Sequence, residues 1–288
     1  MNILLTGAHG FTGRYFLEAA LDHGHAVTAL QADLTNPDAL GREVAGVQPD
    51  AVVHLAAISF VAHADQSALY AVNVVGTTNL LAALAALPKS PSKVLLASSA
   101  NVYGNCTVSP IAETQAVAPV NHYATSKLAM EQMARTYMDR LPIVITRPFN
   151  YTGPGQAPQF VIPKLVSHYA RRESSVELGN MDVEREFNDV RMVCEAYLAL
   201  LDHGVPGEIY NVCSGQPHTL QEVITALTEL SGHHLETRVN PAFVRANEVR
   251  RLCGDGAKLK RLCDASGVTL KQPDLREMLQ WMLAEAAA

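Results

Sequence analysis

Residues 2–20 read NILLTGAHGFTGRYFLEAA, and this stretch decides the fold. The apolar residues before Thr6 predict a short buried strand, and those after Gly13 have the period of a helix. Between them, Gly7 allows a tight turn, Gly10 lets the backbone approach a pyrophosphate, and Gly13 lets the helix pack close to the strand. The helix N-terminus then faces the phosphate charge. Strand, glycine loop and helix in this order predict a dinucleotide site, although a glycine motif alone could be an ordinary turn.

Strands and helices alternate through the first half of the chain. We expect strands at 2–6, 26–31, 51–55, 93–97 and 142–147, with helices near 12–22, 36–45, 66–86 and 123–138. Such alternation predicts an α/β fold, a Rossmann-type doubly wound parallel sheet with helices on both faces.

The pattern loosens after residue 148, where prolines and glycines cluster. Later helices are expected near 161–170, 189–203, 219–231 and 274–285, with short strands near 208–212 and 236–239. We therefore expect a dinucleotide-binding domain over 1–150 and a smaller mixed α/β substrate lobe over 151–288. The chain is expected to cross back to the first domain at least once.

A possible acid–base trio follows the fourth expected strand. Tyr123 and Lys127 are four residues apart, so a helix places both on one face, and Ser99 lies 24 residues before Tyr123. A free phenol has a pKa of about 10, and a neighbouring ammonium is expected to lower it. The serine hydroxyl could then polarise a substrate carbonyl. Taken alone, this Tyr/Lys spacing also fits an ordinary amphipathic helix.

Composition favours a compact globular protein. The chain has 288 residues, of which 48% are hydrophobic and 17% charged. A net charge of −6 and the lack of a basic stripe argue against nucleic acid as a partner. We find no apolar run of membrane-spanning length and no signal sequence, and expect a cytoplasmic protein without a membrane partner. The 5 cysteines and 11 histidines show no ligand spacing, so no metal site is expected.

The chain resembles the extended short-chain dehydrogenases/reductases of the nucleotide-sugar class over almost its whole length. The motifs are TGAHGFTG (6–13), HLAA (54–57), NVVGTTNL (73–80), SSANVYG (98–104), YATSK (123–127) and RPFNYTGPG (147–155). The resemblance implies a nicotinamide cofactor lined by the 54–57 segment and a site ordered by Asn73. It also implies that Pro148 and Asn150 bridge cofactor and sugar, and that the protein is a homodimer. Asn73 itself stands on an otherwise apolar helix and therefore needs a buried partner.

Four later segments narrow the resemblance to one group of the family. GPGQ (153–156), GNMDVEREFNDV (179–190), YNVCSG (210–215) and RANEVR (245–250) are similar to the GDP-4-keto-6-deoxy-D-mannose reductases, which form GDP-D-rhamnose. By this resemblance Asn150, Arg185, Arg245 and Arg250 hold a GDP-linked sugar. Arginine suits the bidentate binding of a diphosphate, although each arginine could also be a solvated surface charge.

The pair after Ser99 separates two reactions within the family. The related 4,6-dehydratases carry Asp-Glu there, whereas this chain has Ala100-Asn101. Neither side chain exchanges a proton near pH 7, so ketone reduction is favoured over dehydration. A nucleotide-sugar 4-epimerase would keep the same trio. A non-catalytic dinucleotide sensor could share the fold, although a sensor needs no proton donor.

The cofactor's phosphate state depends on the end of the second strand. No acid stands at Ala29-Leu30-Gln31, and the absence of an acid favours NADP(H), with NAD(H) also possible. Arg14 or His9 could meet a 2′-phosphate. The expected catalytic residues are Ser99, Tyr123 and Lys127, and Ser99 and Ala100 are also expected to face the substrate. The expected cofactor-binding residues are Gly7, His9, Gly10, Phe11, Gly13, Asp33, Leu34, Leu55, Ala56, Ala57, Asn73, Tyr123, Lys127 and Pro148.

Overall fold

A computed structural model describes residues 1–60, 65–244 and 248–286. Its main body is a six-stranded parallel sheet in the order β10-β5-β4-β3-β1-β2. The strands are β1 (Asn2–Thr6), β2 (Ala26–Ala29), β3 (Ala51–His54), β4 (Lys93–Ala97), β5 (Ile143–Pro148) and β10 (Ile209–Val212). The predicted Rossmann-type sheet is confirmed, and β10 from the second half of the chain completes it beside β5.

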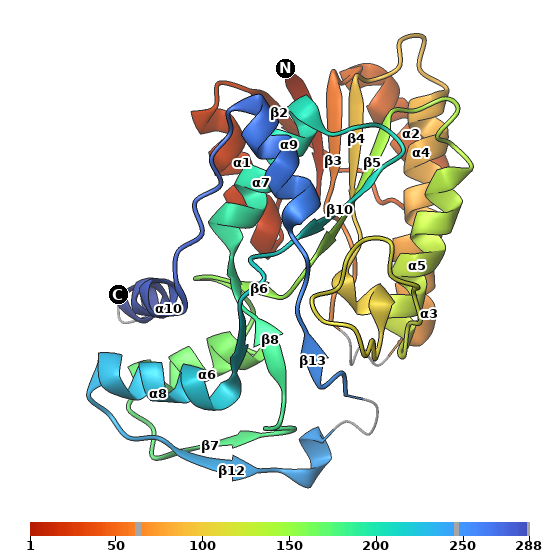
Figure 1. The fold of residues 1–288 in the computed structure, drawn as a ribbon. Helices are drawn as coiled ribbons and strands as arrows, with labels where there is room; N and C mark the ends of the chain where they lie inside the picture. Colours follow the sequence, from red (N-terminus) through yellow and green to blue (C-terminus); the bar gives the residue numbers. More distant parts are fainter. Residues whose placement is uncertain (61–64, 245–247, 287–288) are drawn as a thin grey trace.

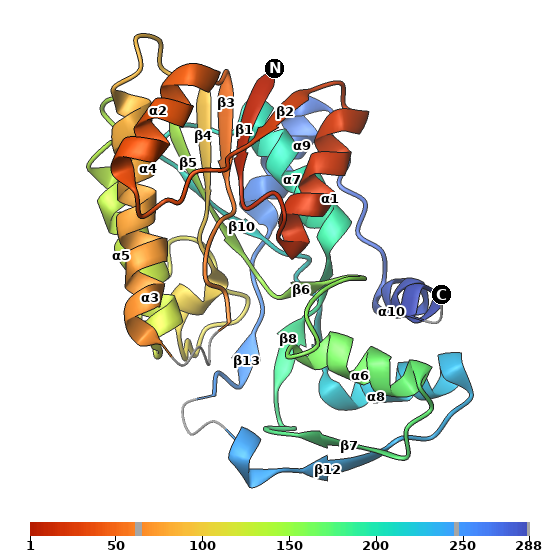
Figure 2. The same ribbon diagram turned by 180° about the vertical axis from the view of Figure 1, so that it is seen from behind.

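Helices cover both faces of this sheet (Figures 1 and 2). One layer holds α1 (Phe11–Asp22), α7 (Val190–His203) and α9 (Ala257–Ser266). The other holds α2 (Pro37–Val47), α3 (Gln66–Tyr70), the π-helix η1 (Ala71–Gly76), α4 (Thr77–Ala85) and α5 (His122–Arg135). Because both faces are covered, strands β3 and β4 carry runs of buried apolar side chains without alternation.

One long helix is unusually apolar. Contrary to our sequence expectation, the continuous helical run Gln66–Ala85 is long and apolar enough to cross a membrane by length and composition, with a mean hydropathy of 1.5 in its most apolar window. It packs between α2 and α5, and it carries the buried polar residues Asn73 and Thr77. Core helices of water-soluble proteins pass the same test.

The second body lies beyond the carboxyl ends of the strands (Figure 1). Helices α6 (Val161–Ala170), α8 (Leu220–Ser231) and α10 (Leu275–Ala286) enclose a separate apolar core. Around them stand β7 (Ser175–Leu178) with β12 (Glu236–Val239), and β8 (Glu184–Glu186) between β11 (Pro217–Thr219) and β13 (Arg251–Leu252). The short helices η2 (Ala100–Tyr103) and η3 (Pro241–Phe243) complete the described elements. A domain boundary at residue 150 stays a prediction.

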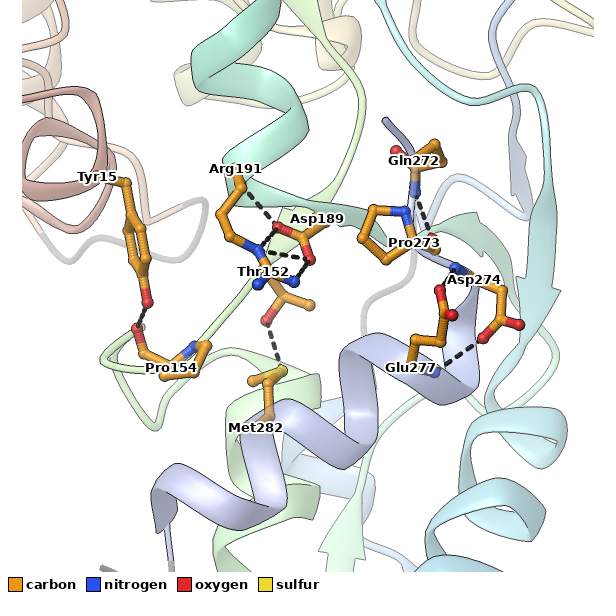
Figure 3. A network of polar contacts seen from close by, with 10 residues as sticks. All are labelled: Tyr15, Thr152, Pro154, Asp189, Arg191, Gln272, Pro273, Asp274, Glu277 and Met282. Carbon is orange, nitrogen blue, oxygen red and sulfur yellow. Dashed lines mark hydrogen bonds and ion pairs between the residues drawn. The ribbon is translucent and has the colours of Figure 1, made fainter. Parts of the chain in front are cut away.

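A joint of polar and aromatic side chains connects the two bodies (Figure 3). Strand β6 (Tyr151–Thr152) pairs with β9 (Asn188–Asp189), which leads directly into α7. The Tyr15 hydroxyl donates to the Pro154 carbonyl at 2.8 Å, and the Arg191 guanidinium lies 3.7 Å from the Trp281 ring centre. The ring of Tyr15 also packs edge-on against Trp281, at 5.9 Å, so helix α10 of the second body contacts α1 and α7 of the first.

Candidate active site

The glycine loop has the close packing that a dinucleotide site requires. Gly7 has a φ of +71°, and a Cβ there would lie 2.8 Å from the Ala56 nitrogen. A Cβ on Gly13 would lie 2.0 Å from the Gly7 carbonyl oxygen, so only glycine fits where α1 crosses β1. Gly10 caps α1 without a side-chain hydrogen bond, and His9 and Gly10 are exposed. The first amides of α1 are thus open to an anion such as a pyrophosphate.

A buried polar chain fixes the neighbouring strand end. The Thr77 hydroxyl donates to the Asn73 carbonyl at 2.8 Å, so the His54 Nε2–H must donate to Thr77 Oγ1. His54 Nδ1 then accepts from the Thr6 hydroxyl at 2.7 Å, and Thr6 Oγ1 accepts the N–H groups of Leu55 and Ala56. Burial lowers the pKa of His54 to about 3, with the Lys127 charge adding to the effect, so this imidazole is neutral. The 54–57 segment therefore has a fixed backbone beside Gly7.

Asn73 has the buried partners that the sequence predicted. Its side chain is 1% exposed, and its Oδ1 accepts from the Ile58 N–H at 2.9 Å. Its Nδ2 donates to the Ile58 carbonyl at 3.1 Å and to Ser126 Oγ at 3.0 Å. Ser126 in turn donates to the Tyr123 carbonyl at 2.8 Å. Asn73 thus ties the loop after β3 to the first turn of α5.

Helix α5 brings the three residues of the predicted trio together. Asn121 caps the helix by accepting from the Ala124 N–H, which starts α5 just before Tyr123. Tyr123 is 8% exposed and lies against Ser99, which follows the end of β4. Lys127 is 4% exposed, and its Nζ donates to the Ala97 carbonyl at 2.7 Å. Phenol, ammonium and serine hydroxyl therefore meet at the carboxyl end of β4.

The pKa of Tyr123 moves in the direction opposite to our expectation. Burial raises it, and the hydrogen bond with Ser99 acts against that rise. The pKa of Lys127 is lowered by burial to about 8, while the charge of Glu131 raises it. Desolvation of the buried phenol is the larger of the two causes, so the raised pKa prevails. A protonated Tyr123 at neutral pH suits a proton donor.

Asn101 sets the direction of the Ser99 hydrogen bond. Its backbone N–H and its Nδ2 donate to Ser99 Oγ at 3.2 and 3.1 Å. These two donors occupy the lone pairs of the hydroxyl, so the single hydroxyl hydrogen remains for donation. Ser99 is thereby arranged to donate toward Tyr123 or toward a carbonyl oxygen.

A carboxylate from a neighbouring helix lies at the end of β2, and the sequence pattern did not reveal it. Glu43 of α2 accepts from the N–H groups of Gln31 and Ala32 at 2.8 and 2.7 Å. This acid stands 12 residues beyond Gln31, on a helix, and so escaped a search of the strand end. Asp33 is exposed and is held by Thr35, which lowers the pKa of its carboxyl, while Leu34 is buried.

Two of the predicted substrate residues, Arg185 and Arg250, are in direct contact. Arg185 is 7% exposed, and its guanidinium donates to Glu248 at 2.8 Å and to the carbonyls of Val249 and Arg250. Arg250 is exposed, and Arg245 lies outside the described residues. A pocket of about 390 Å³ is lined by Asn105, Cys106, Thr107, Glu248, Val249, Arg250 and Arg251.

Four further residues complete the comparison with the predicted site. Asn150 is exposed at the end of β5, where its carbonyl accepts from the backbone and side chain of Asn188. Pro148 at the end of β5 is buried, and so is Ala100, which follows Ser99 in the chain. Phe11 packs edge-on against Tyr15 at 5.6 Å, on the first turn of α1. Across residues 1–60, 65–244 and 248–286, no group of three or more His, Cys, Asp or Glu residues could hold a metal ion.

Sequence reasoning missed the buried ion pair beneath the trio. Glu131 has no exposed surface, and it accepts from Arg147 Nε at 3.0 Å and Arg147 Nη2 at 2.6 Å. Ser98 Oγ donates to the same carboxylate at 2.5 Å. The signal was present in the sequence, since Glu131 follows Lys127 by one helical turn.

Fold and site together define an NAD(P)-linked enzyme of the extended Rossmann type. The model of the NAD dependent epimerase/dehydratase family matches residues 3–213, and the chain belongs to that family.

Its relatives include nucleotide-sugar enzymes of full length. The chain is 39% identical to the GDP-6-deoxy-D-mannose reductase of Pseudomonas aeruginosa, covering 96% of this chain and 95% of the relative. It is 34% identical to the GDP-6-deoxy-D-talose 4-dehydrogenase of Aggregatibacter actinomycetemcomitans, covering 90% of each. The structure of RMD from Pseudomonas aeruginosa complexed with NADPH superposes with a TM-score of 0.89 at 35% identity, covering 99% of this chain and 98% of the other.

Proposed function

We propose that the protein reduces the C4 ketone of a nucleotide-linked 4-keto-6-deoxyhexose with NAD(P)H. The favoured substrate is GDP-4-keto-6-deoxy-D-mannose, and the product is then GDP-D-rhamnose. One observation carries the proposal: a protonated Tyr123 lies against Ser99, and Ser99 is followed by Ala100-Asn101 instead of an acid and a base. Such a site can supply one proton to a ketone oxygen and has no pair of groups to expel water.

The residues divide the reaction among three roles. The glycine loop and the 54–57 segment would hold the reduced dinucleotide at the carboxyl ends of the strands, where it would supply the hydride. Ser99 donates a hydrogen bond to the C4 carbonyl oxygen, since Asn101 leaves its hydrogen available. Tyr123 gives its proton to that oxygen as negative charge develops there. Lys127 stabilises the phenolate that remains and also holds the ribose of the nicotinamide half.

The glycine loop, Leu55–Ala57 and Asn73 are proposed to hold the cofactor. Close packing at Gly7 and Gly13 and the uncapped start of α1 suit a dinucleotide. NADP(H) is favoured because β2 itself carries no acid that would repel a 2′-phosphate. NAD(H) is also accepted in this proposal, because the Glu43 carboxylate lies at the strand end and would oppose that phosphate. Comparing kcat/KM for NADPH and NADH decides between them.

The sugar nucleotide is proposed to bind between the two bodies, against Asn150 and the arginine-containing loops. Arg185 and Arg250 come together at residues 248–250, beside the 390 Å³ pocket. Glu248 must release Arg185 before that guanidinium can bind a diphosphate directly. Arg245 retains its predicted role as a proposal.

A cytoplasmic homodimer is the proposed state of the protein. Neighbouring helices η1 and α5 expose the large apolar side chains of Val75 and Met133, at 52% and 37%. A second copy covering this face would remove them from water. Sedimentation of the wild type and of Val75→Glu/Met133→Glu tests the dimer, which the substitutions are expected to dissociate.

The function is tested by following oxidation of NADPH and NADH with freshly prepared GDP-4-keto-6-deoxy-D-mannose. Rapid consumption with a single 6-deoxyhexose product supports the reductase, and NMR of the product gives the configuration at C4. Tyr123→Phe is expected to bind both substrates nearly as well and to lower kcat by about 10²–10⁴-fold. Near-normal turnover in this variant would contradict the assigned proton donor. Interconversion of C4 epimers without net oxidation would instead identify a 4-epimerase.

A further inference from the structure

Helix α5 presents a third polar side chain in line with Tyr123 and Lys127. Glu131 follows Lys127 by four residues, so all three side chains project from one face of the helix. Its carboxylate is fully buried. Neither the hydride transfer nor the proton transfer described above uses this carboxylate.

The three α5 residues bind three consecutive residues at the end of β4. Lys127 Nζ donates to the Ala97 carbonyl at 2.7 Å. Ser98 Oγ donates to Glu131 Oε1 at 2.5 Å, and Tyr123 lies against Ser99. Glu131 therefore holds the residue next to the one proposed to polarise the substrate carbonyl.

Arg147 anchors this carboxylate from the neighbouring strand. It donates from Nε and Nη2 to the two oxygens of Glu131, at 3.0 and 2.6 Å. Its guanidinium lies 4.8 Å from the ring centre of Tyr103, whose hydroxyl donates to Asn211 Oδ1 of β10 at 2.8 Å. The position of Glu131 is thus fixed from β4, β5 and β10 together.

Few charges face the buried ammonium of Lys127. Glu131 on its own helix is the carboxylate that favours the charged form. The neighbouring elements contribute the neutral His54 on β3 and the arginine partner of Glu131 on β5. The segment that follows β4 contributes the uncharged Ser98 and Ser99. A buried arginine–carboxylate pair is weak evidence for stability, because apolar residues often replace such a pair without loss. Glu131 lies one helical turn from Lys127, so its carboxylate can act on the site as well as on stability.

We propose that Glu131 is a positioning residue for the reaction, which fixes the strand end carrying Ser99 and supplies the negative charge beside Lys127. This inference rests on the proposed function for its catalytic consequence. The charge on Lys127 can be measured without any substrate.

The first test removes the charge and keeps the hydrogen bond. In Glu131→Gln/Arg147→Met, the amide oxygen still accepts from Ser98, and no buried guanidinium is left without a partner. The protonation of Lys127 is followed by NMR of isotope-labelled lysine Cε, and its signal is assigned by its loss in Lys127→Arg. We expect the titration midpoint of Lys127 to fall by about one pH unit, since a nearby opposite charge has been removed. The pH at which kcat changes on the alkaline side of its profile should fall by the same amount.

A matched control separates this effect from general loss of a buried pair. Asp189→Asn/Arg191→Met removes another fully buried carboxylate together with its arginine, at the joint of the two bodies. This variant is expected to leave the midpoint of Lys127 unchanged. An unchanged midpoint in the folded Glu131→Gln/Arg147→Met protein would overturn the charge role.

The second test removes the hydrogen bond between Ser98 and Glu131 and keeps the charge of Glu131. Ser98→Ala is expected to lower kcat by about 10-fold through misplacement of Ser99, with the Lys127 midpoint unchanged. Wild-type kcat in this variant would overturn the positioning role. If the wild type fails to reduce the GDP-linked ketosugar while the Lys127 midpoint still shifts, the proposed substrate fails and the charge role of Glu131 stands.

Discussion

Among the residues that the structure describes, two fully buried carboxylates pair with arginines, and the surroundings of the two pairs differ. Glu131 meets Arg147 beneath the proposed catalytic trio, and the arginine side chain is 5% exposed. Asp189 meets Arg191 at the start of α7, where the arginine side chain is 48% exposed (Figure 3). The first pair is closed within the sheet, whereas the second opens to solvent and carries the ring of Trp281.

The difference teaches what each pair can contribute. In the closed pair both charges have lost water, so each depends on the other and on Ser98 for its hydrogen bonds. In the open pair, water still solvates Arg191, and Asp189 also accepts the backbone N–H of residue 191 at 2.8 Å. The closed pair therefore fixes charge and position near the chemistry, while the open pair supports the packing of α10 on the first body.

Breaking the closed pair from one side should have the largest effect. Glu131→Leu leaves the guanidinium of Arg147 buried without its carboxylate, and we expect the free energy of unfolding to fall by about 3–5 kcal/mol. Urea unfolding followed by circular dichroism measures this change. Glu131→Gln/Arg147→Met should lose clearly less. Equal losses in the two variants would show that the unpaired charge is not the cause.

The buried imidazole of His54 should also make the stability of the protein sensitive to acid. The unfolded chain protonates His54 near its usual pKa of 6.5, whereas the folded protein does so only near 3. The unfolded state thus binds more protons between these values, and stability falls as the pH drops below 6.5. The loss is about 1.4 kcal/mol for each pH unit, or about 2 kcal/mol at pH 5.

His54→Gln removes this contribution and tests it. The difference in unfolding free energy between pH 7 and pH 5 should shrink by about 2 kcal/mol in the variant, measured by urea titration at both values. A variant of the open joint, Arg191→Met, should retain the wild-type difference, because it leaves His54 and its partners Thr6 and Thr77 in place. The same acid sensitivity in His54→Gln would contradict the buried neutral imidazole.

Local sequence patterns predicted the parts of the protein that depend on short-range rules. The glycine loop, the strands of the main sheet and the Tyr123/Lys127 spacing each lie within one strand, turn or helix, and periodicity and glycine geometry are visible at that range. Helix α9 was missed although Leu259 and Cys263 are spaced by one turn and Gly267 ends it, since its apolar face is narrow.

Contacts between distant segments were beyond such patterns. Glu43 reaches the end of β2 from a helix, and Arg185 pairs with Glu248 across 63 residues. The direction of the Tyr123 pKa also depends on burial, which is a property of the assembled fold. The roles of the individual site residues stay predictions until the variants above are measured.

Removing the arginine of the open pair should have the smallest effect on stability. Arg191→Met removes a half-exposed guanidinium, and we expect the free energy of unfolding to fall by about 1 kcal/mol. Trp281 is the single tryptophan of the chain, so its fluorescence reports this joint alone. Loss of the cation at 3.7 Å should change its emission while the Lys127 midpoint remains constant. If Arg191→Met destabilises the protein as much as Glu131→Leu, the exposure of the arginine does not set the cost of losing one partner, and the contrast between the closed and open pairs fails.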